Sequence, residues 1–266
     1  MRFPVFTFTQ AFGFFLGLVF LTGASGHSWI DLLTVVGGTS STAMTTINHQ
    51  GFIRNYKGHI DATASYRLLD LNQPVCADFQ QVVNQIGMPE YPQLNASAGD
   101  FVQGTYTENG HISLPASPTA KSGMTYWFGT TNPNGKATLK DILAWKDGNS
   151  SEGALLSTAP FDDGVCVEVN PSEISKERVA ANGGVPPGPC KSTFKIPETV
   201  APDSVYTVYW VWDFSGKLGN DAPDHVEWYT SCMDIKIIGK PSTNNVSSPN
   251  SQSAKVPKIK GREPKL

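Results

Sequence analysis

The chain has 266 residues, of which 39% are hydrophobic and 16% are charged, and its formal net charge is −3. This balance hides a split, because residues 27–239 hold 13 basic and 22 acidic side chains, whereas residues 240–266 hold six basic and one acidic. An acidic body argues against a nucleic-acid partner, since phosphate binding needs clustered Lys and Arg. The body is long enough for one well-filled domain.

The start of the chain has the features of an export signal. Arg2 supplies a positive charge, and an apolar run covers residues 11–21, which is short for a membrane span. Small residues follow, and Ala24 and Gly26 occupy the two positions that a signal peptidase inspects. We therefore expect residues 1–26 to be removed before His27 and the mature protein to be secreted to the extracellular space. The sequence also allows cleavage one or two residues to either side.

Four cysteines lie in the body: Cys76, Cys166, Cys190 and Cys232. An even number in an exported protein predicts two disulfides, for which three pairings are possible. Cys166 and Cys190 flank one loop-rich stretch and are expected to pair, which leaves Cys76 with Cys232. None of the four has the C-x-x-C spacing of a zinc or redox site.

Three Asn-x-Ser sequons begin at Asn95, Asn149 and Asn245. They are the acceptor pattern for N-linked glycans, which are attached to surface loops on a eukaryotic secretory route. We expect the protein to be a glycoprotein, although so short a pattern also arises by chance.

Strands and polar loops alternate in the first half of the body. Residues 27–38 form the first expected strand, because β-branched and apolar residues precede a Gly-Gly pair. Residues 40–75 are mixed and polar and predict long loops, whereas the apolar spacing within residues 76–86 predicts one short helix. Stretches rich in Thr and aromatic residues predict strands at 101–107 and 123–130.

The second half of the body has the same character. Capping residues predict short helices over residues 138–145 and 172–181, and the second of these should end at Asn182-Gly183-Gly184. Many strands with only short helices predict an all-β fold, an immunoglobulin- or fibronectin-III-like β-sandwich with long loops. The remaining expected strands cover residues 165–169, 191–196, 204–214 and 225–238.

Beyond residue 239 the composition changes to Ser, Asn, Pro and Lys. Such a segment has too little apolar surface to bury a core, so we expect residues 240–266 to be a disordered tail. The tail has no hydrophobic end, so a lipid-anchor signal is not expected. The domain organisation expected is thus a signal peptide, one β-sandwich domain over residues 27–239 and this tail.

Five histidines are candidates for metal binding. If the mature chain starts at His27, that residue offers both an α-amino group and an imidazole, which together close a chelate ring on one ion. Cu(II) favours such tetragonal nitrogen ligation. His111 follows an expected strand in Asn109-Gly110-His111, where the glycine lets the backbone turn closely. His49 and His59 are interpreted as surface or satisfied structural residues.

The last expected strand carries a row of polar side chains. His225, Glu227 and Tyr229 alternate with their neighbours and therefore share one face. That face presents an imidazole, a carboxylate and a phenol in sequence. The alternative interpretation is the exposed polar face of an edge strand.

These motifs resemble those of the fungal lytic polysaccharide monooxygenases, which are secreted copper enzymes that begin with histidine. The shared features are a signal cut before His27, a strand opened by Gly-Asp that leads to Gly110-His111, and a late Trp-Tyr-x-x-Cys run ending at Cys232. The resemblance extends from His27 to Ile238 but rests on short motifs. It is closer to a poorly characterised fungal branch than to the well-studied cellulose-active family.

The resemblance implies a copper site with one ion. His27 would supply its amino group and a ring nitrogen, His111 would supply the third nitrogen, and Tyr229 would occupy the axial direction. Glu227 matches a place where the cellulose-active family has Gln, which positions the oxygen species, so Glu227 and Tyr229 are the expected catalytic residues. Cys232 matches a cysteine that ties the last strand to an early loop, which fits its pairing with Cys76.

One family feature is missing from the sequence. The cellulose-active family carries a further histidine beside the metal on the preceding strand, whereas this chain has Trp210 and Trp212 there. His225 is a candidate replacement. The absence of this histidine bears more on the expected substrate than on the expected copper ligands.

The function implied is oxidative cleavage of glycosidic bonds in a polysaccharide, either cellulose, chitin or hemicellulose, by a monomer that uses an external electron donor. A second hypothesis is a secreted copper-binding or transport protein without oxygenase activity, for which Glu227 or Asp31 would be an extra carboxylate ligand. A third is a cell-wall interaction module whose histidines are incidental. Neither a nucleic-acid nor a membrane partner is expected.

Overall fold

The computed structural model describes residues 27–37, 50–84, 88–113, 122–148, 150–215 and 226–239. Several expectations lie outside these residues and are untested, namely those for the export signal, the basic tail, His49, His225, Asn149 and Asn245. Asn95 is described and lies partly exposed in a short strand.

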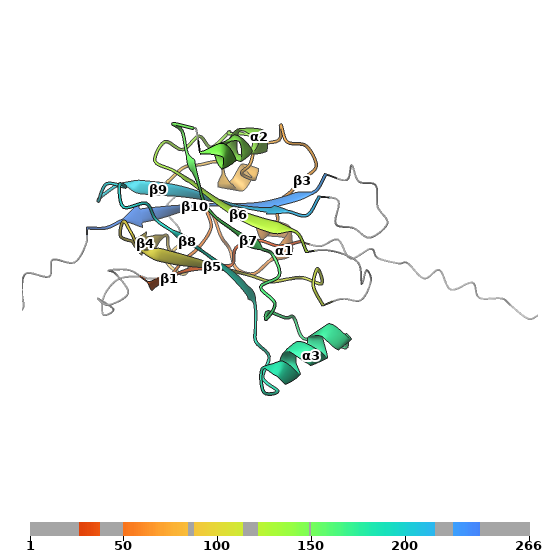
Figure 1. Ribbon diagram of the computed structural model, residues 1–266. Coiled ribbons are helices and arrows are strands. Elements are labelled where there is room, and N and C mark those ends of the chain that lie inside the picture. Colours follow the sequence, from red (N-terminus) through yellow and green to blue (C-terminus); the bar gives the residue numbers. More distant parts are fainter. Residues whose placement is uncertain are drawn as a thin grey trace, which may run out of the picture.

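Two sheets pack face to face as a β-sandwich, which confirms the expected fold class (Figure 1). The first sheet has the strand order β2-β1-β5-β8, all antiparallel; its strands are β2 (Gln50–Gly51), β1 (Leu32–Gly37), β5 (Phe101–Tyr106) and β8 (Cys190–Lys195). The second has the order β3-β10-β9-β6-β7 and a further strand, β4, parallel to β10; its strands are β3 (Arg67–Leu68), β10 (Trp228–Ile237), β9 (Val205–Asp213), β6 (Met124–Thr130), β7 (Ala154–Pro160) and β4 (Leu94–Ala96).

Strand β9 is buried on both faces, which explains why residues 205–212 are all β-branched or aromatic. Trp210 and Trp212 face the core between the sheets, whereas Tyr209 and Val211 belong to a second apolar cluster on the outer side of the sheet. The two sheets approach closely at Gly104, where a Cβ atom would lie 2.5 Å from the Trp127 ring. Only glycine therefore fits at this point of β5.

Three short α-helices lie among the described residues: α1 (Asp61–Ala64), α2 (Leu139–Leu143) and α3 (Glu173–Ala181). Helix α2 begins at a capping box formed by Thr138 and Asp141 and continues as a 3-10 turn, and α3 is capped by the Ser172 side chain. Both helices were expected from the sequence. Figure 1 shows α3 standing away from both sheets. No helix in the described ranges has the length and apolar character needed to cross a bilayer.

Some sequence expectations are wrong in detail. The first strand begins at Leu32 rather than at His27. The helix expected over residues 76–86 is only a 3-10 turn, Asp78–Gln80, in the described part, because the Gln80 side chain and carbonyl bind Cys232 N and Arg54 rather than continuing a helix. The strand β7 was not expected at all, since its Ser and Ala residues give little strand signal.

The expectation of a strand over residues 165–169 is also wrong. Side chains bind the backbone amides that a sheet would need: the Asp163 carboxylate accepts hydrogen bonds from the N–H groups of Val165 and Cys166. The Glu108 carboxylate accepts one from the N–H group of Glu168. A single bridge, Val167 to Gly188, is the only ladder contact that the described structure has here.

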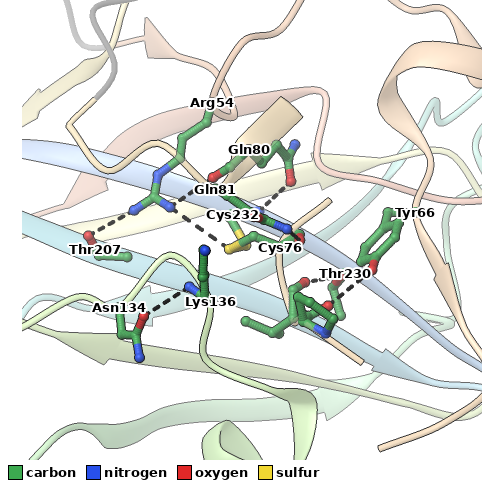
Figure 2. The surroundings of a disulfide bond; sticks show 12 residues. Arg54, Tyr66, Cys76, Gln80, Gln81, Asn134, Lys136, Thr207, Thr230 and Cys232 are labelled. Atoms are coloured by element: carbon green, nitrogen blue, oxygen red, sulfur yellow. Dashed lines mark hydrogen bonds between the residues drawn. A yellow bond between two sulfur atoms is a disulfide. The ribbon is translucent and has the colours of Figure 1, made fainter. Parts of the chain in front are cut away.

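Both expected disulfides are present, Cys76–Cys232 and Cys166–Cys190. The first ties the loop before Asp78 to the middle of β10, and the second ties the loop after β7 to the start of β8. Figure 2 shows the Arg54 guanidinium beside the first disulfide, with Thr207 accepting one of its hydrogen bonds. Arg54 also forms a buried ion pair with Asp234 at 2.6 Å. The Cys76–Cys232 disulfide therefore lies beside a buried polar network rather than in a purely apolar core.

Buried tyrosines predict a loss of stability at alkaline pH. Burial raises the pKa of Tyr209 to about 12, above the value of about 10 for an unfolded tyrosine. A raised pKa contributes stability that is complete below pH ~10 and is lost as the pH rises towards 12, by up to ~1.4 kcal/mol per unit. We expect the free energies of unfolding of the wild type and of Tyr209→Phe, measured in urea, to differ by a constant amount from pH ~7 to ~9. Above pH ~10 the wild type should lose stability relative to the variant. A constant difference up to pH 11.5 would contradict this assignment.

Candidate metal centre

The segment after His27 is attached to both sheets. The Ser28 hydroxyl donates to the carbonyl of Thr107 at 2.9 Å, and the amide of Ile30 donates to the Ser231 hydroxyl at 3.1 Å. The amide of Asp31 then donates to the Thr105 carbonyl at 2.9 Å. His27 is therefore held at the ends of β5 and β10, although it precedes the first strand.

His111 lies in a tight turn just beyond β5. Asn109 and Gly110 both have positive φ, 46° and 80°, and the amide of His111 donates to the Glu108 carbonyl at 2.9 Å. The Asn109 side-chain amide donates to the carbonyl of His27 at 2.6 Å. The turn thus brings the two histidines, 84 positions apart, to the same end of the sandwich.

Tyr229 is the residue that both histidines approach. The ring centroids of His27 and His111 each lie 6.4 Å from that of Tyr229. His27 and His111 are partly exposed, whereas Tyr229 is fully buried on β10. The structure therefore brings together the three residues that the sequence predicts as metal ligands.

Glu227 lies against the same phenol. The Tyr229 hydroxyl donates to a Glu227 carboxylate oxygen, and the Arg67 guanidinium lies 3.8 Å from that oxygen. Burial raises the pKa of Tyr229 well above its ordinary value, and the hydrogen bond to Glu227 raises it further, so the phenol stays neutral at physiological pH. Glu227 is only 4% exposed, and β10 has neighbours on both sides, so the interpretation as an exposed edge strand is wrong.

Aromatic rings line the buried side of the site. Trp212 stacks on Tyr229, with centroids 5.0 Å apart, and stands edge-on to His111 at 4.6 Å. Phe214 also meets His111 edge-on, at 4.4 Å. Of the two tryptophans singled out on this strand, Trp212 therefore touches the site, whereas Trp210 packs on Tyr106 in the core.

Two carboxylates support the turn that carries His111. Glu108 is 1% exposed and accepts from the amides of Ile112 and Glu168 at 2.9 and 3.2 Å. Burial raises the pKa of the Glu168 carboxyl and nearby Glu108 raises it further, whereas hydrogen bonds from the backbone of Asn109 and Gly110 lower it. The turn is thus held by Glu108, which is its own first residue, and by Glu168, which lies in the loop after β7.

Asp31 and His59 form a separate cluster. Asp31 accepts from the Trp29 indole at 2.6 Å and the Tyr56 hydroxyl at 2.7 Å, and it pairs with the exposed His59 ring at 2.9 Å. These contacts account for both residues structurally, which agrees with the interpretation of His59 as a satisfied surface residue.

Among the described residues, no Asp, Glu or Cys side chain lies close enough to His27 and His111 to form a three-residue group of possible metal ligands with them. The cluster that does occur there consists of Asp163, Cys166 and Cys190. Its two sulfur atoms form a disulfide and therefore offer no thiolate to a metal.

The donor set at His27, His111 and Tyr229 fits copper better than a hard cation. The two imidazoles are borderline nitrogen ligands that suit copper, and the free amine of a chain starting at His27 would add a third nitrogen. Calcium and magnesium would instead need several oxygen ligands.

Three supporting residues were missed by sequence reasoning: Arg67, Asn109 and Glu168. The Asn-Gly pair before His111 is a turn signal that could have indicated Asn109, because Asn tolerates positive φ. Arg67 lies in a stretch without any pattern and Glu168 in one that predicts a strand, and both reach the site only through tertiary contacts.

The chain belongs to the family described as a domain of unknown function, DUF7492, which it matches over residues 24–262. No match was found among curated proteins.

Solved structures similar to this chain include copper-containing and polysaccharide-active proteins. A cellulose-active polysaccharide monooxygenase from M. thermophila is 17% identical, with 80% of this chain and 79% of that chain covered and a TM-score of 0.38. A glycoside hydrolase family 61 member from Hypocrea jecorina is 16% identical, with 80% and 82% covered and a TM-score of 0.33. A CBM33 protein from Bacillus amyloliquefaciens in complex with Cu(I) is 14% identical, with 60% and 62% covered and a TM-score of 0.28. At these values the likeness assigns no residue and no activity to this chain.

Proposed function

We propose that this protein is a secreted, copper-dependent monooxygenase that oxidatively cleaves glycosidic bonds of a polysaccharide. The observation that carries the proposal is the approach of His27 and His111 to the same buried phenol, Tyr229, from two different segments of the chain. His27 directly follows the export signal expected over residues 1–26, and removal of that signal would turn His27 into a terminal chelate. The motif resemblance to lytic polysaccharide monooxygenases supports the same assignment.

His27, His111 and Tyr229 would hold one copper ion. When bound, copper supplies the redox chemistry that activates dioxygen or peroxide for attack on a C–H bond at a glycosidic carbon. The α-amino group of His27 must lose its proton to bind, and such groups titrate near pH ~8, so affinity falls as the pH is lowered.

The residues around the donors have separate tasks. Glu227 accepts the hydrogen bond of the Tyr229 hydroxyl and so fixes the direction in which that oxygen points. Trp212 and Phe214 pack edge-on against His111, which keeps its ring in one orientation and excludes water from the buried side. The partly exposed faces of the two histidines leave the outer side for the substrate.

A copper carrier with the same N-terminal chelate is the second candidate. Such a protein would have Asp31 or Glu227 as an additional ligand. Both carboxylates are engaged otherwise, Asp31 with Trp29, Tyr56 and His59, and Glu227 with the Tyr229 hydroxyl. These contacts favour the monooxygenase.

The test starts with secretion of the full chain from a eukaryotic host and sequencing of its amino terminus. The processed protein, loaded with one equivalent of copper, is then incubated with cellulose, chitin or xylan in the presence of ascorbate and oxygen. We expect the sequence His-Ser-Trp at the terminus and oxidised oligosaccharides from one of the polymers, detected by mass spectrometry.

Each other outcome supports a different candidate. Tight copper binding without oxidised products from any polymer would favour the carrier. A terminus other than His27, or no change in thermal stability on adding copper, would leave only the wall-interaction module.

A further inference from the structure

We propose that Asn109 is a positioning residue that ties the first residue of the processed protein to the turn carrying His111. The inference rests on the proposed function, because it concerns the geometry of the same two ligands. The observation behind it is the hydrogen bond from the Asn109 side-chain amide to the carbonyl of His27, 2.6 Å long. It is a direct link between the segments that supply the two imidazoles.

The bond is placed so that it leaves metal binding possible. It uses the carbonyl oxygen of His27 and neither the α-nitrogen nor the ring nitrogens of that residue. Its donor lies two positions before His111, on the same turn. The amide therefore restrains one ligand residue from the backbone of the other without occupying a ligand atom.

The turn that carries the donor is held by backbone hydrogen bonds, among them that from the amide of His111 to the Glu108 carbonyl. Asn109 adopts φ of 46°, a left-handed conformation that asparagine tolerates better than most residues, and Gly110 follows with φ of 80°. The buried Glu108 carboxylate accepts backbone hydrogen bonds on the far side of the turn. A restraint attached to such a turn transmits its position to His27.

His27 needs a restraint because it would be a chain end. Terminal residues are mobile unless other contacts hold them in place. A mobile chelating residue loses conformational entropy when it binds an ion, which weakens the binding. Ser28 provides a second attachment through its bond to Thr107. Asn109 is the attachment on His27 itself, so its loss should be felt at the metal ligands first.

The test compares the wild type with Asn109→Gly. Glycine keeps access to the left-handed backbone but removes the amide donor, so the turn is preserved and only the tether is lost. The matched control is Asn55→Gly, because Asn55 also has a positive φ, 53°, but lies in the loop after β2. Copper affinity is measured by competition with a chelator, the Cu(II) site by electron paramagnetic resonance, and the order of the terminal residues in the metal-free protein by ¹⁵N relaxation.

We expect Asn109→Gly to bind Cu(II) ~10–100-fold more weakly, the range found when groups that orient metal ligands are removed. Its resonance spectrum should show altered or heterogeneous nitrogen coupling, and Ser28 should become mobile in the metal-free protein. Asn55→Gly should match the wild type in all three measurements. Equal affinity, spectrum and order in Asn109→Gly and wild type would overturn the proposal.

Failure of the proposed function gives a different pattern. If the wild type itself binds no copper, the monooxygenase assignment falls. Increased mobility of Ser28 in metal-free Asn109→Gly would still support the tether, whereas unchanged mobility would refute it.

Discussion

Replacing His111 by alanine is expected to remove most of the copper-induced rise in unfolding temperature of the processed protein. A ligand that binds only the folded state stabilises it by ~4 kcal/mol at a thousandfold excess over its dissociation constant. His111 supplies the only imidazole from the body of the domain that approaches Tyr229 among the described residues. Without it the terminal chelate of His27 is left alone, and the gain should fall to a small fraction of that value.

The measurement is differential scanning calorimetry with and without Cu(II), each variant being compared with its own metal-free form. His59→Ala is the matched control, because His59 is an exposed histidine that pairs with Asp31 rather than approaching Tyr229. Its copper-induced rise should equal that of the wild type. A full rise in His111→Ala, or a loss in His59→Ala, would show that the ion is bound elsewhere.

Removing the Cys76–Cys232 disulfide should destabilise the domain more than removing Cys166–Cys190. The paired cysteines are 156 residues apart in the first case and 24 in the second. Loop-closure entropy in the unfolded chain then predicts losses of about 5 and about 3 kcal/mol. The first loss should be enlarged by the surroundings of Cys76, where the buried Arg54 guanidinium lies 3.8 Å from the sulfur.

Urea unfolding of the two double Cys→Ala variants gives the free energies directly. The order of the two losses is the informative result, because it does not depend on the absolute size of the entropy term. A larger loss in the Cys166/Cys190 variant would mean that this bridge is more important for native packing than for chain entropy.

The parts of the fold that the sequence predicts well are those decided locally. Strands β5, β6, β9 and β10 are rich in β-branched and aromatic residues. Helices α2 and α3 have capping residues at Thr138 and Ser172, whose side chains bind the first turn in the structure as expected. The two disulfide pairings also agree with the expectation from spacing.

The errors occur where side-chain hydrogen bonds, rather than strand or helix pairing, determine the backbone. Val165 to Val169 has a strand pattern, but the carboxylates of Asp163 and Glu108 bind its amides instead. The same applies to Gln80, whose contacts with Arg54 and Cys232 replace a helix. The contacts of Glu108 and Gln80 join residues far apart in sequence, so no local pattern contains them, whereas the contacts of Asp163 are local.

The site divides in the same way. His27, His111, Glu227 and Tyr229 were accessible from motifs, because residue type and position near strand ends pointed to them. Arg67 and Asn109 were not, because their roles depend on a guanidinium that reaches across from β3 and on an amide that meets a backbone carbonyl.

The bond between the amide of Ile30 and the hydroxyl of Ser231 spans 201 positions of the sequence. A ribosome makes Ser231 long after Ile30, whereas Thr105 and Thr107, which hold the same segment to the first sheet, are made much earlier. During synthesis the segment can therefore dock on β5 well before β10 exists, and its link to the second sheet forms only when translation of the domain is nearly over.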